Sequence, residues 1–90
     1  MTRLMNIGFG NVVNTDKIIS IVTADSAPAK RMIQKAKEQE NLIDATQGRR
    51  TKSVISMENG CLVLSALQPD TLSLRFNQIT VDTEVQDDTD

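Results

Sequence analysis

The sequence has no histidine and only one cysteine, Cys61, in 90 residues. Without imidazole, a histidine-based hydrolase triad is excluded, and the remaining donors argue against a transition-metal or structural zinc site. A single cysteine cannot form an intrachain disulfide. Cys61 precedes three aliphatic residues, so we expect it to be a buried structural thiol. We therefore expect no catalytic residues, no metal and no cofactor, in a protein that is not an enzyme.

Aromatic residues and long apolar runs are also scarce. Trp and Tyr are absent, and Phe9 and Phe76 are the only aromatic residues, fewer than a single-strand binder uses to stack bases. No apolar stretch approaches the roughly 18 residues of a membrane span, and residues 1–8 do not resemble a signal peptide. An unpaired thiol without an export signal favours the cytoplasm. We expect no membrane partner and no small-molecule substrate.

The apolar content is sufficient for a core, but the core is thin. Leu, Ile, Val and Phe make up 24 of the 90 residues, above the roughly 20% below which chains usually stay disordered. A chain of this size buries only about 60–65% of its unfolded surface, so its stability is marginal without additional support. With disulfides and metals excluded, self-association remains. We expect a homo-oligomer.

The net charge of −2 hides an uneven distribution. Residues 80–90 hold five acidic and no basic residues, which leaves residues 1–79 with a net charge of +3. We expect one domain over residues 1–79 and an acidic, disordered tail over residues 80–90. The basic excess concentrates in residues 30–52, which carry a net charge of +4. This distribution suits a nucleic-acid binder. A solvated helix face together with a disordered tail would produce it too.

Hydrophobic periodicity predicts the first half of the fold. Residues 4–7 and 11–13 indicate a strand that resumes after the bend Gly8-Phe9-Gly10, and the β-branched run 18–23 indicates a buried strand. Asp25 or Ser26 caps a helix over about residues 27–40, in which Pro28 is tolerated in the first turn. The buried face of this helix has helical spacing: Ala29, Met32, Ile33 and Ala36.

Turn signals define the second half. Asn59-Gly60 between the β-rich runs 52–57 and 61–67 predicts a β-hairpin. A short extended segment over 42–46 and a turn at Gln47-Gly48 precede it. Pro69 opens a last short helix, whose inward residues are expected to be Leu72, Phe76 and Ile79. The order β-β-α-β-β-α predicts an α+β domain, a small antiparallel sheet with two helices on one side.

Two candidate sites are rejected on their spacing. Gly8-Phe9-Gly10 superficially resembles a dinucleotide-binding loop, but Val13 replaces the third glycine and no helix follows directly. We interpret Gly8 and Gly10 as residues needed for backbone geometry. Asp44 and Asp70 do not form a convincing acid–base pair. Asp44 is expected to serve a turn or an ion pair with an arginine, and Asp70 to lie in the first turn of a helix.

The segment Arg49-Arg50-Thr51-Lys52 is the strongest candidate site. It places three cations in four residues, directly after Gly48, at the entry to a strand. The planar fork of arginine suits bidentate phosphate binding, although an ordinary solvated turn would have a similar sequence. No recognition-helix pattern is present. Double-stranded DNA held mainly by its phosphates requires no aromatic residues, so the sequence is compatible with this partner.

Four segments together resemble the RemA family of small bacterial regulators of extracellular-matrix (biofilm) genes. The likeness extends from about residue 5 to residue 75, and its most specific part is Gly48-Arg49-Arg50-Thr51 in register with the rest. The segments are Asn6-Ile7-Gly8-Phe9-Gly10-Asn11, Ser26-Ala27-Pro28-Ala29-Lys30-Arg31, Ile43-Asp44-Ala45-Thr46-Gln47-Gly48-Arg49-Arg50-Thr51 and Leu64-Ser65-Ala66-Leu67-Gln68-Pro69-Asp70-Thr71.

The resemblance implies a DNA-binding transcriptional regulator, with a fold related to LytTR-type domains, in a ring-shaped homo-oligomer around which DNA wraps. It places DNA-contacting residues at Arg49, Arg50 and Lys17, where lysine keeps the charge of the family's arginine but loses its fork. Lys52 and Arg31 complete the predicted basic set. Pro28, Gly8, Gly10 and Gly48 are the predicted structural residues. The alternative is a small oligomeric interaction module that binds acidic proteins or RNA.

Overall fold

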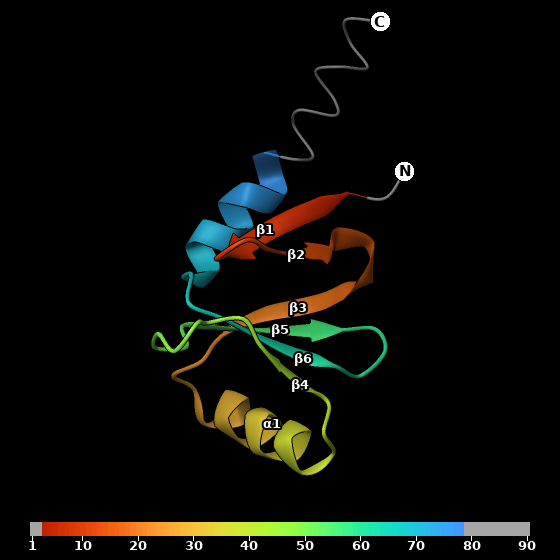
Figure 1. Ribbon diagram of the computed structural model, residues 1–90, viewed down its shortest axis with the longest axis vertical. Coiled ribbons are helices and arrows are strands. Elements are labelled where there is room, and N and C mark those ends of the chain that lie inside the picture. Colours follow the sequence, from red (N-terminus) through yellow and green to blue (C-terminus); the bar gives the residue numbers. More distant parts are fainter. Residues whose placement is uncertain (1–2, 79–90) are drawn as a thin grey trace, which may run out of the picture.

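The chain begins with a β-hairpin that leads into a second, larger sheet (Figure 1). The computed structural model describes residues 3–78, so the expected role of Ile79 and the acidic tail over residues 80–90 lie outside the described residues. The elements are β1 (Leu4–Gly8), β2 (Asn11–Asn14), the 3-10 turn η1 (Thr15–Lys17), β3 (Ile18–Thr23), α1 (Ala27–Glu38), β4 (Leu42–Asp44), β5 (Ser53–Met57) and β6 (Leu62–Ser65), followed by helical residues 69–78.

The strands form two sheets where a single antiparallel sheet was expected. Within residues 3–78, strands β1 and β2 pair only with each other, and the second sheet has the order β3-β5-β6-β4. Its β4–β6 pair is parallel, with Leu42 opposite Leu62. The chain reverses direction twice between β4 and β6, so the two strands must point the same way. The bend at residues 8–10 closes a complete hairpin, which is why β1 and β2 are separate strands.

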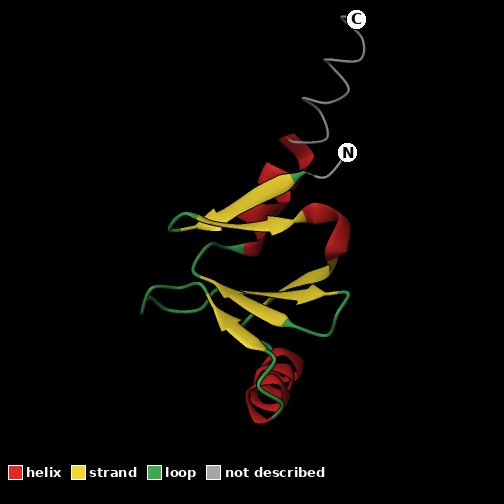
Figure 2. Ribbon diagram, turned by 45° about the vertical axis from the view of Figure 1, so that its right-hand side comes forward, coloured by secondary structure: helices red, strands yellow, loops and turns green. Residues whose placement is uncertain are grey.

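The two helices lie on opposite sides of the larger sheet, so the prediction of helices on one side is wrong. Helix α1 covers one face, and the β1–β2 hairpin with residues 69–78 covers the other (Figures 1 and 2). Alternation along β5 and β6 explains this arrangement, because successive strand residues point to opposite faces. Val54 packs with the α1 residues Ala29 and Ala36, whereas Ile55 packs with Met5 of the hairpin.

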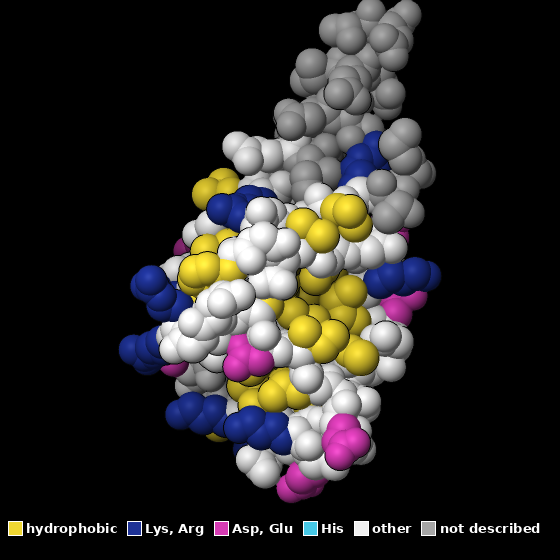
Figure 3. Space-filling view, in the orientation of Figure 1, with side chains coloured by type: hydrophobic (Ala, Val, Ile, Leu, Met, Phe, Trp, Pro, Cys, Tyr) yellow, Lys and Arg dark blue, Asp and Glu magenta, His cyan; other side chains and the backbone are white. Residues whose placement is uncertain are grey.

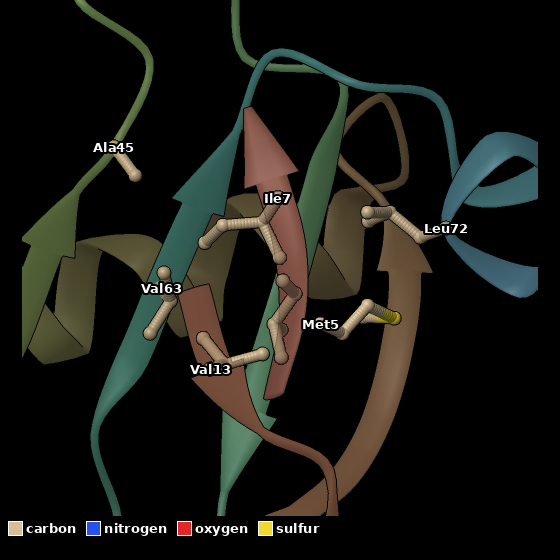
Figure 4. Packing of buried hydrophobic residues seen from close by; sticks show 7 residues of the cluster. Met5, Ile7, Val13, Ala45, Val63 and Leu72 are labelled. Atoms are coloured by element: carbon tan, nitrogen blue, oxygen red, sulfur yellow. The ribbon is translucent and has the colours of Figure 1, made fainter. Parts of the chain in front are cut away.

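Two apolar clusters share the larger sheet as their common wall. On the hairpin side, Met5, Ile7 and Val13 meet Val63, Leu72 and Ala45 (Figure 4). On the helix side, Ala24, Ala29, Ala36, Val54, Leu62 and Leu64 pack together. All four residues of the central strand β6 are buried, and three of them, Leu62, Val63 and Leu64, are apolar; Ser65 ends the strand. Such a run is typical of a strand that is covered on both faces. Each cluster is small, so stability depends on both faces remaining covered.

Helix α1 begins where the sequence indicates, and Ser26 is its cap. The Ser26 hydroxyl oxygen accepts a hydrogen bond from the Ala29 N–H at 3.2 Å, and Pro28 occupies the first turn. Asp25 is therefore free of the capping role. Two other expectations are wrong: Phe76, expected to face inward, is 40% exposed, and Cys61, expected to be buried, is only partly buried. Leu72 is buried as predicted. Phe76 lies near the C-terminal end of the described helix.

Candidate nucleic-acid interface

Residues 46–52, hereafter the basic loop, connect β4 to β5 and carry the three clustered cations. The loop starts from a turn held by Asp44. The Asp44 carboxylate accepts hydrogen bonds from the Thr46 hydroxyl at 2.6 Å and from the Thr46 N–H at 2.9 Å. These two bonds, the hydroxyl first, lower the pKa of Asp44. The carboxylate thus serves the turn, which was one of the two roles predicted for it.

The turn then reverses through two residues with positive φ. Gln47 has φ 54° and Gly48 has φ 78°, and the Arg49 N–H donates to the Thr46 carbonyl at 3.0 Å. A Cβ at Gly48 would meet nothing within 4 Å. Glycine is therefore favoured there by backbone conformation, and crowding plays no part. The reversal directs Arg49 and Arg50 outward, where both are exposed.

The far end of the basic loop is anchored between two strands. The Lys52 N–H donates to the Ser65 carbonyl at 2.9 Å, and the Lys52 carbonyl accepts from the Ala24 N–H at 3.1 Å. The next residue, Ser53, is fully buried, and its hydroxyl donates to the Leu67 carbonyl. The loop is held at both ends by hydrogen bonds, so its cations are presented from a defined backbone.

Each arginine of the basic loop meets a different neighbour. The Arg49 guanidinium carbon lies 5.9 Å from the centre of the Phe9 ring, within the range of a cation–π contact. The Arg50 Nη2 lies 3.4 Å from Asp25 Oδ1, with both side chains more than 70% exposed. An exposed ion pair of this kind contributes about 0–1 kcal/mol, so a phosphate can replace it at little cost.

These cations surround a shallow hollow. Arg49, Arg50 and Lys52 line it together with Phe9, Ala66 and Leu67, and its volume is about 340 Å³. Basic side chains gather along the edge of the molecule where the basic loop projects in Figure 1 (Figure 3). The hollow is open and cationic with an apolar floor. This arrangement suits an anion that carries an apolar body, such as a nucleotide unit of a nucleic-acid strand.

The tip of the β1–β2 hairpin contributes the apolar part of this hollow. Gly8, Phe9 and Gly10 have φ values of 110°, 55° and 78°. The Asn6 side chain accepts from the Gly8 N–H at 2.7 Å, and the Asn11 amide donates to the Gly8 carbonyl at 3.1 Å. The two glycines make a compact turn that projects Phe9 toward Arg49.

The structure does not bring every predicted cation into this hollow. Lys17 lies in η1, and its Nζ is 3.6 Å from Glu58 Oε2. It precedes β3, whereas Asp25, the partner of Arg50, follows β3. A six-residue strand spans roughly 20 Å, so Lys17 lies on a separate part of the surface. Arg31 is exposed in the second turn of α1, in the layer beneath the sheet.

Three residues were missed in the sequence: the two neighbours of the arginines, and the residue that connects the hairpin to the basic loop. Asp25 and Phe9 are the missed neighbours of the arginines. Buried Ser65 makes the connection: its hydroxyl donates to the Ile7 carbonyl at 2.7 Å, while its carbonyl accepts from Lys52. In the sequence, two features could have indicated these neighbours: the carboxylate of Asp25 next to the Ser26 cap, and the aromatic Phe9 between two glycines.

A second hollow is apolar and lies away from the basic loop. Its volume is about 560 Å³, and its lining includes Val12, Ile43, Met57, Cys61 and Val63, with Lys17 and Glu58 among its polar residues. Val12 is 51% and Ile43 is 53% exposed. The apolar surface visible between the hairpin and the larger sheet in Figure 3 corresponds to this region. Exposed apolar surface around a hollow is typical of an interaction site.

Two kinds of site are not found among residues 3–78. No cluster of at least three acidic, cysteine or histidine side chains is placed to hold a metal ion. No helix in this range has the length and apolar character required to cross a membrane.

Comparison with known proteins gives consistent matches over nearly the whole chain. The family model described as RemA-like, extracellular matrix regulatory protein A-like, matches residues 4–76. A candidate regulatory protein of Lachnoclostridium phytofermentans is 55% identical over 78 residues, which cover 87% of this chain and 86% of that protein. One from Acaryochloris marina is 51% identical over 84 residues, covering 91% and 96%. One from Bacillus velezensis is 48% identical over 86 residues, covering 96% and 93%.

Proposed function

This chain belongs to the RemA-like family, and on that premise we propose that it is a transcriptional regulator that binds double-stranded DNA through the basic loop. The family and its relatives are named as regulatory proteins, which favours regulation over catalysis. The observation that carries the proposal is the hollow where Arg49, Arg50 and Lys52 project from a loop anchored at both ends. The family name makes extracellular-matrix genes the expected target class.

The arrangement favours phosphate contacts over base reading. Arginine and lysine side chains at a loop tip suit phosphate oxygens, which position a protein on DNA without reading its sequence. The exposed ion pair with Asp25 holds the Arg50 guanidinium at the edge of the hollow. Because such an exposed pair is weak, a phosphate oxygen can replace the Asp25 carboxylate at little cost in free energy. Selectivity then comes from DNA shape and bendability, as in proteins that wrap DNA.

We also propose that the protein acts as a ring-shaped homo-oligomer, as the family resemblance implies, with a fold related to LytTR-type domains. Three clustered cations per copy give weak binding, but several copies on one duplex act at high effective concentration. The apolar hollow supports self-association, because Val12 and Ile43 are half exposed around it. A second copy would cover this surface and support the two thin clusters of each domain.

The experiment that tests this function is a titration of labelled duplex DNA at two salt concentrations, with Arg49→Ala and Arg50→Ala as variants. The matched control is Lys35→Ala, which removes an exposed cation from α1 at a distance from the basic loop in sequence. The native protein and the control should bind, both arginine variants should bind less, and higher salt should weaken all binding. Preference for RNA or for an acidic polypeptide over duplex DNA would overturn the proposal in favour of an interaction module.

A further inference from the structure

Phe9 occupies a position that is unfavourable for an aromatic residue in two ways. Its φ is 55°, and its side chain is 50% exposed at the tip of a hairpin. A bulky residue in the left-handed region is strained and persists only where the surroundings compensate for it. Asparagine would adopt the same backbone more readily. The turn itself therefore does not require this residue.

The packing of the domain does not require it either. Phe9 belongs to neither apolar cluster, and the hydrogen bonds that shape the tip come from Asn6 and Asn11. The Gly8 backbone approaches Leu67, since a Cβ built at Gly8 would lie 3.5 Å from Leu67 Cγ. This close approach and the Ser65–Ile7 hydrogen bond place the hairpin tip against the end of β6. The tip is thus a firm support that holds a half-exposed aromatic ring.

The ring lies within the cationic hollow. Phe9 lines that hollow together with the three cations of the basic loop, and the Arg49 guanidinium lies over its ring. Ala66 and Leu67 extend the apolar floor beside it. A phosphate held by the arginines would bring its own sugar, and the base edge behind it, toward this floor. Apolar side chains placed next to arginines are a recurring means of engaging the minor groove of duplex DNA.

We propose that Phe9 is a DNA-contacting residue, whose ring packs against the sugars and base edges of the minor groove while Arg49 and Arg50 hold the flanking phosphates. This inference rests on the proposed function and adds an apolar contact to it. The cation–π contact with Arg49 is then part of the bound arrangement, because it keeps the guanidinium and the ring on the same side of the hollow.

The test uses Phe9→Asn, with Leu4→Thr as the matched control. Asparagine tolerates positive φ, so Phe9→Asn should fold at least as stably as the native chain. Leu4→Thr removes an exposed apolar side chain from the same hairpin. Phe9→Asn should weaken duplex binding about tenfold, in the range of losing one aromatic contact. The dependence of affinity on salt should keep its native slope, since no phosphate contact is lost. Leu4→Thr should bind as the native protein does.

A second variant reports the contact directly. The chain has no Trp or Tyr, so Phe9→Trp introduces a single fluorophore, whose emission should change and saturate in step with DNA binding measured by anisotropy. Native affinity in Phe9→Asn, or a Trp signal that does not change while DNA binds, would overturn the inference and leave the proposed function standing. A reduced salt slope, as in Arg49→Ala, would overturn it by showing that Phe9 only positions Arg49. Failure of the native protein to bind any duplex would remove the proposed function itself.

Discussion

Ser65→Ala should destabilise the protein far more than the loss of one exposed hydroxyl would suggest. Ser65 is fully buried, and its hydroxyl donates to the Ile7 carbonyl at 2.7 Å and accepts from the Leu67 N–H at 3.1 Å. The first bond joins the β1–β2 hairpin to the larger sheet, and the second shapes the corner that follows β6. Alanine fits the space but leaves both backbone groups without this partner.

The magnitude follows from those two groups. A neutral hydrogen bond contributes about 1 kcal/mol net, and a buried group left unpaired costs about 1–3 kcal/mol. We expect the free energy of unfolding to fall by about 2–3 kcal/mol in total. For a domain of this size, that loss lowers the melting temperature by on the order of 10 °C. Ser53→Ala removes one such bond, to the Leu67 carbonyl, and should have about half the effect.

The neighbouring strand supplies a matched control. Ser56 Oγ is enclosed and has no hydrogen-bond partner among the described residues, so Ser56→Ala should change stability by less than about 0.5 kcal/mol or increase it. Urea unfolding of all variants at equal protein concentration makes the comparison, since oligomer stability depends on concentration. Equal midpoints for Ser65→Ala and Ser56→Ala would refute the assignment of Ser65 as the residue that joins the hairpin to the sheet.

Four further outcomes are expected. Arg49→Ala and Arg50→Ala should weaken DNA binding while leaving circular dichroism and unfolding midpoints within about 0.5 kcal/mol of the native values; an unfolded variant would show that the arginine is structural. The plot of log affinity against log salt should have a slope nearer −10 than about −2, because each neutralised phosphate contributes about −0.9. In Arg50→Ala this slope should become less steep by several units. A native slope near −2 would rule out multivalent wrapping. Ile43→Glu should reduce the mass in light scattering to that of a monomer, while Gln34→Glu on α1 should keep the native mass; a monomeric native protein would contradict the ring. The hydrogen bonds to Thr46 lower the pKa of Asp44 in the folded protein below its ordinary value of 3.8, so the carboxylate contributes its full stabilisation above that pH and loses it as the pH falls through the folded pKa. In urea unfolding measured between about pH 5 and pH 2, Asp44→Asn should therefore lose less stability with falling pH than the native protein. The same pH dependence in the variant and the native protein would contradict this role of Asp44.

Local sequence signals were sufficient for the elements that depend on neighbouring residues. The spacing of Ala29 and Ala36 predicted the buried face of α1, and Asn59-Gly60 predicted the β5–β6 hairpin. The basic loop was also evident as a cluster of charge after Gly48. In each case the deciding interaction joins residues that are close in the chain, so pattern and turn chemistry carry the information.

The arrangement of those elements could not be read in this way. Two apolar faces of one strand predict a buried strand but do not say which helix covers which face, and the assignment of both helices to one side failed for that reason. The neighbours of the two arginines are also distant in sequence: Asp25 is 25 positions from Arg50, and Phe9 is 40 positions from Arg49. Only the completed sheet brings these residues together.

The order of strands in the larger sheet has a consequence for how the chain folds. The β5–β6 hairpin closes over a short turn, whereas β4 pairs with β6 across 20 positions, from Leu42 to Leu62, and β3 pairs with β5 across about 30 to 39. Loop closure costs more entropy as the separation grows, so the hairpin is the natural nucleus and the outer strands add later. The bond from the Lys52 N–H to the Ser65 carbonyl extends this hairpin, whereas the bond from the Ala24 N–H to the Lys52 carbonyl forms only once β3 has joined the sheet. A partly folded copy without β3 and β4 in the sheet would therefore hold the basic loop at the Lys52 end by one of its two bonds only. If the proposed function is right, such a copy should bind duplex DNA less well than the folded protein.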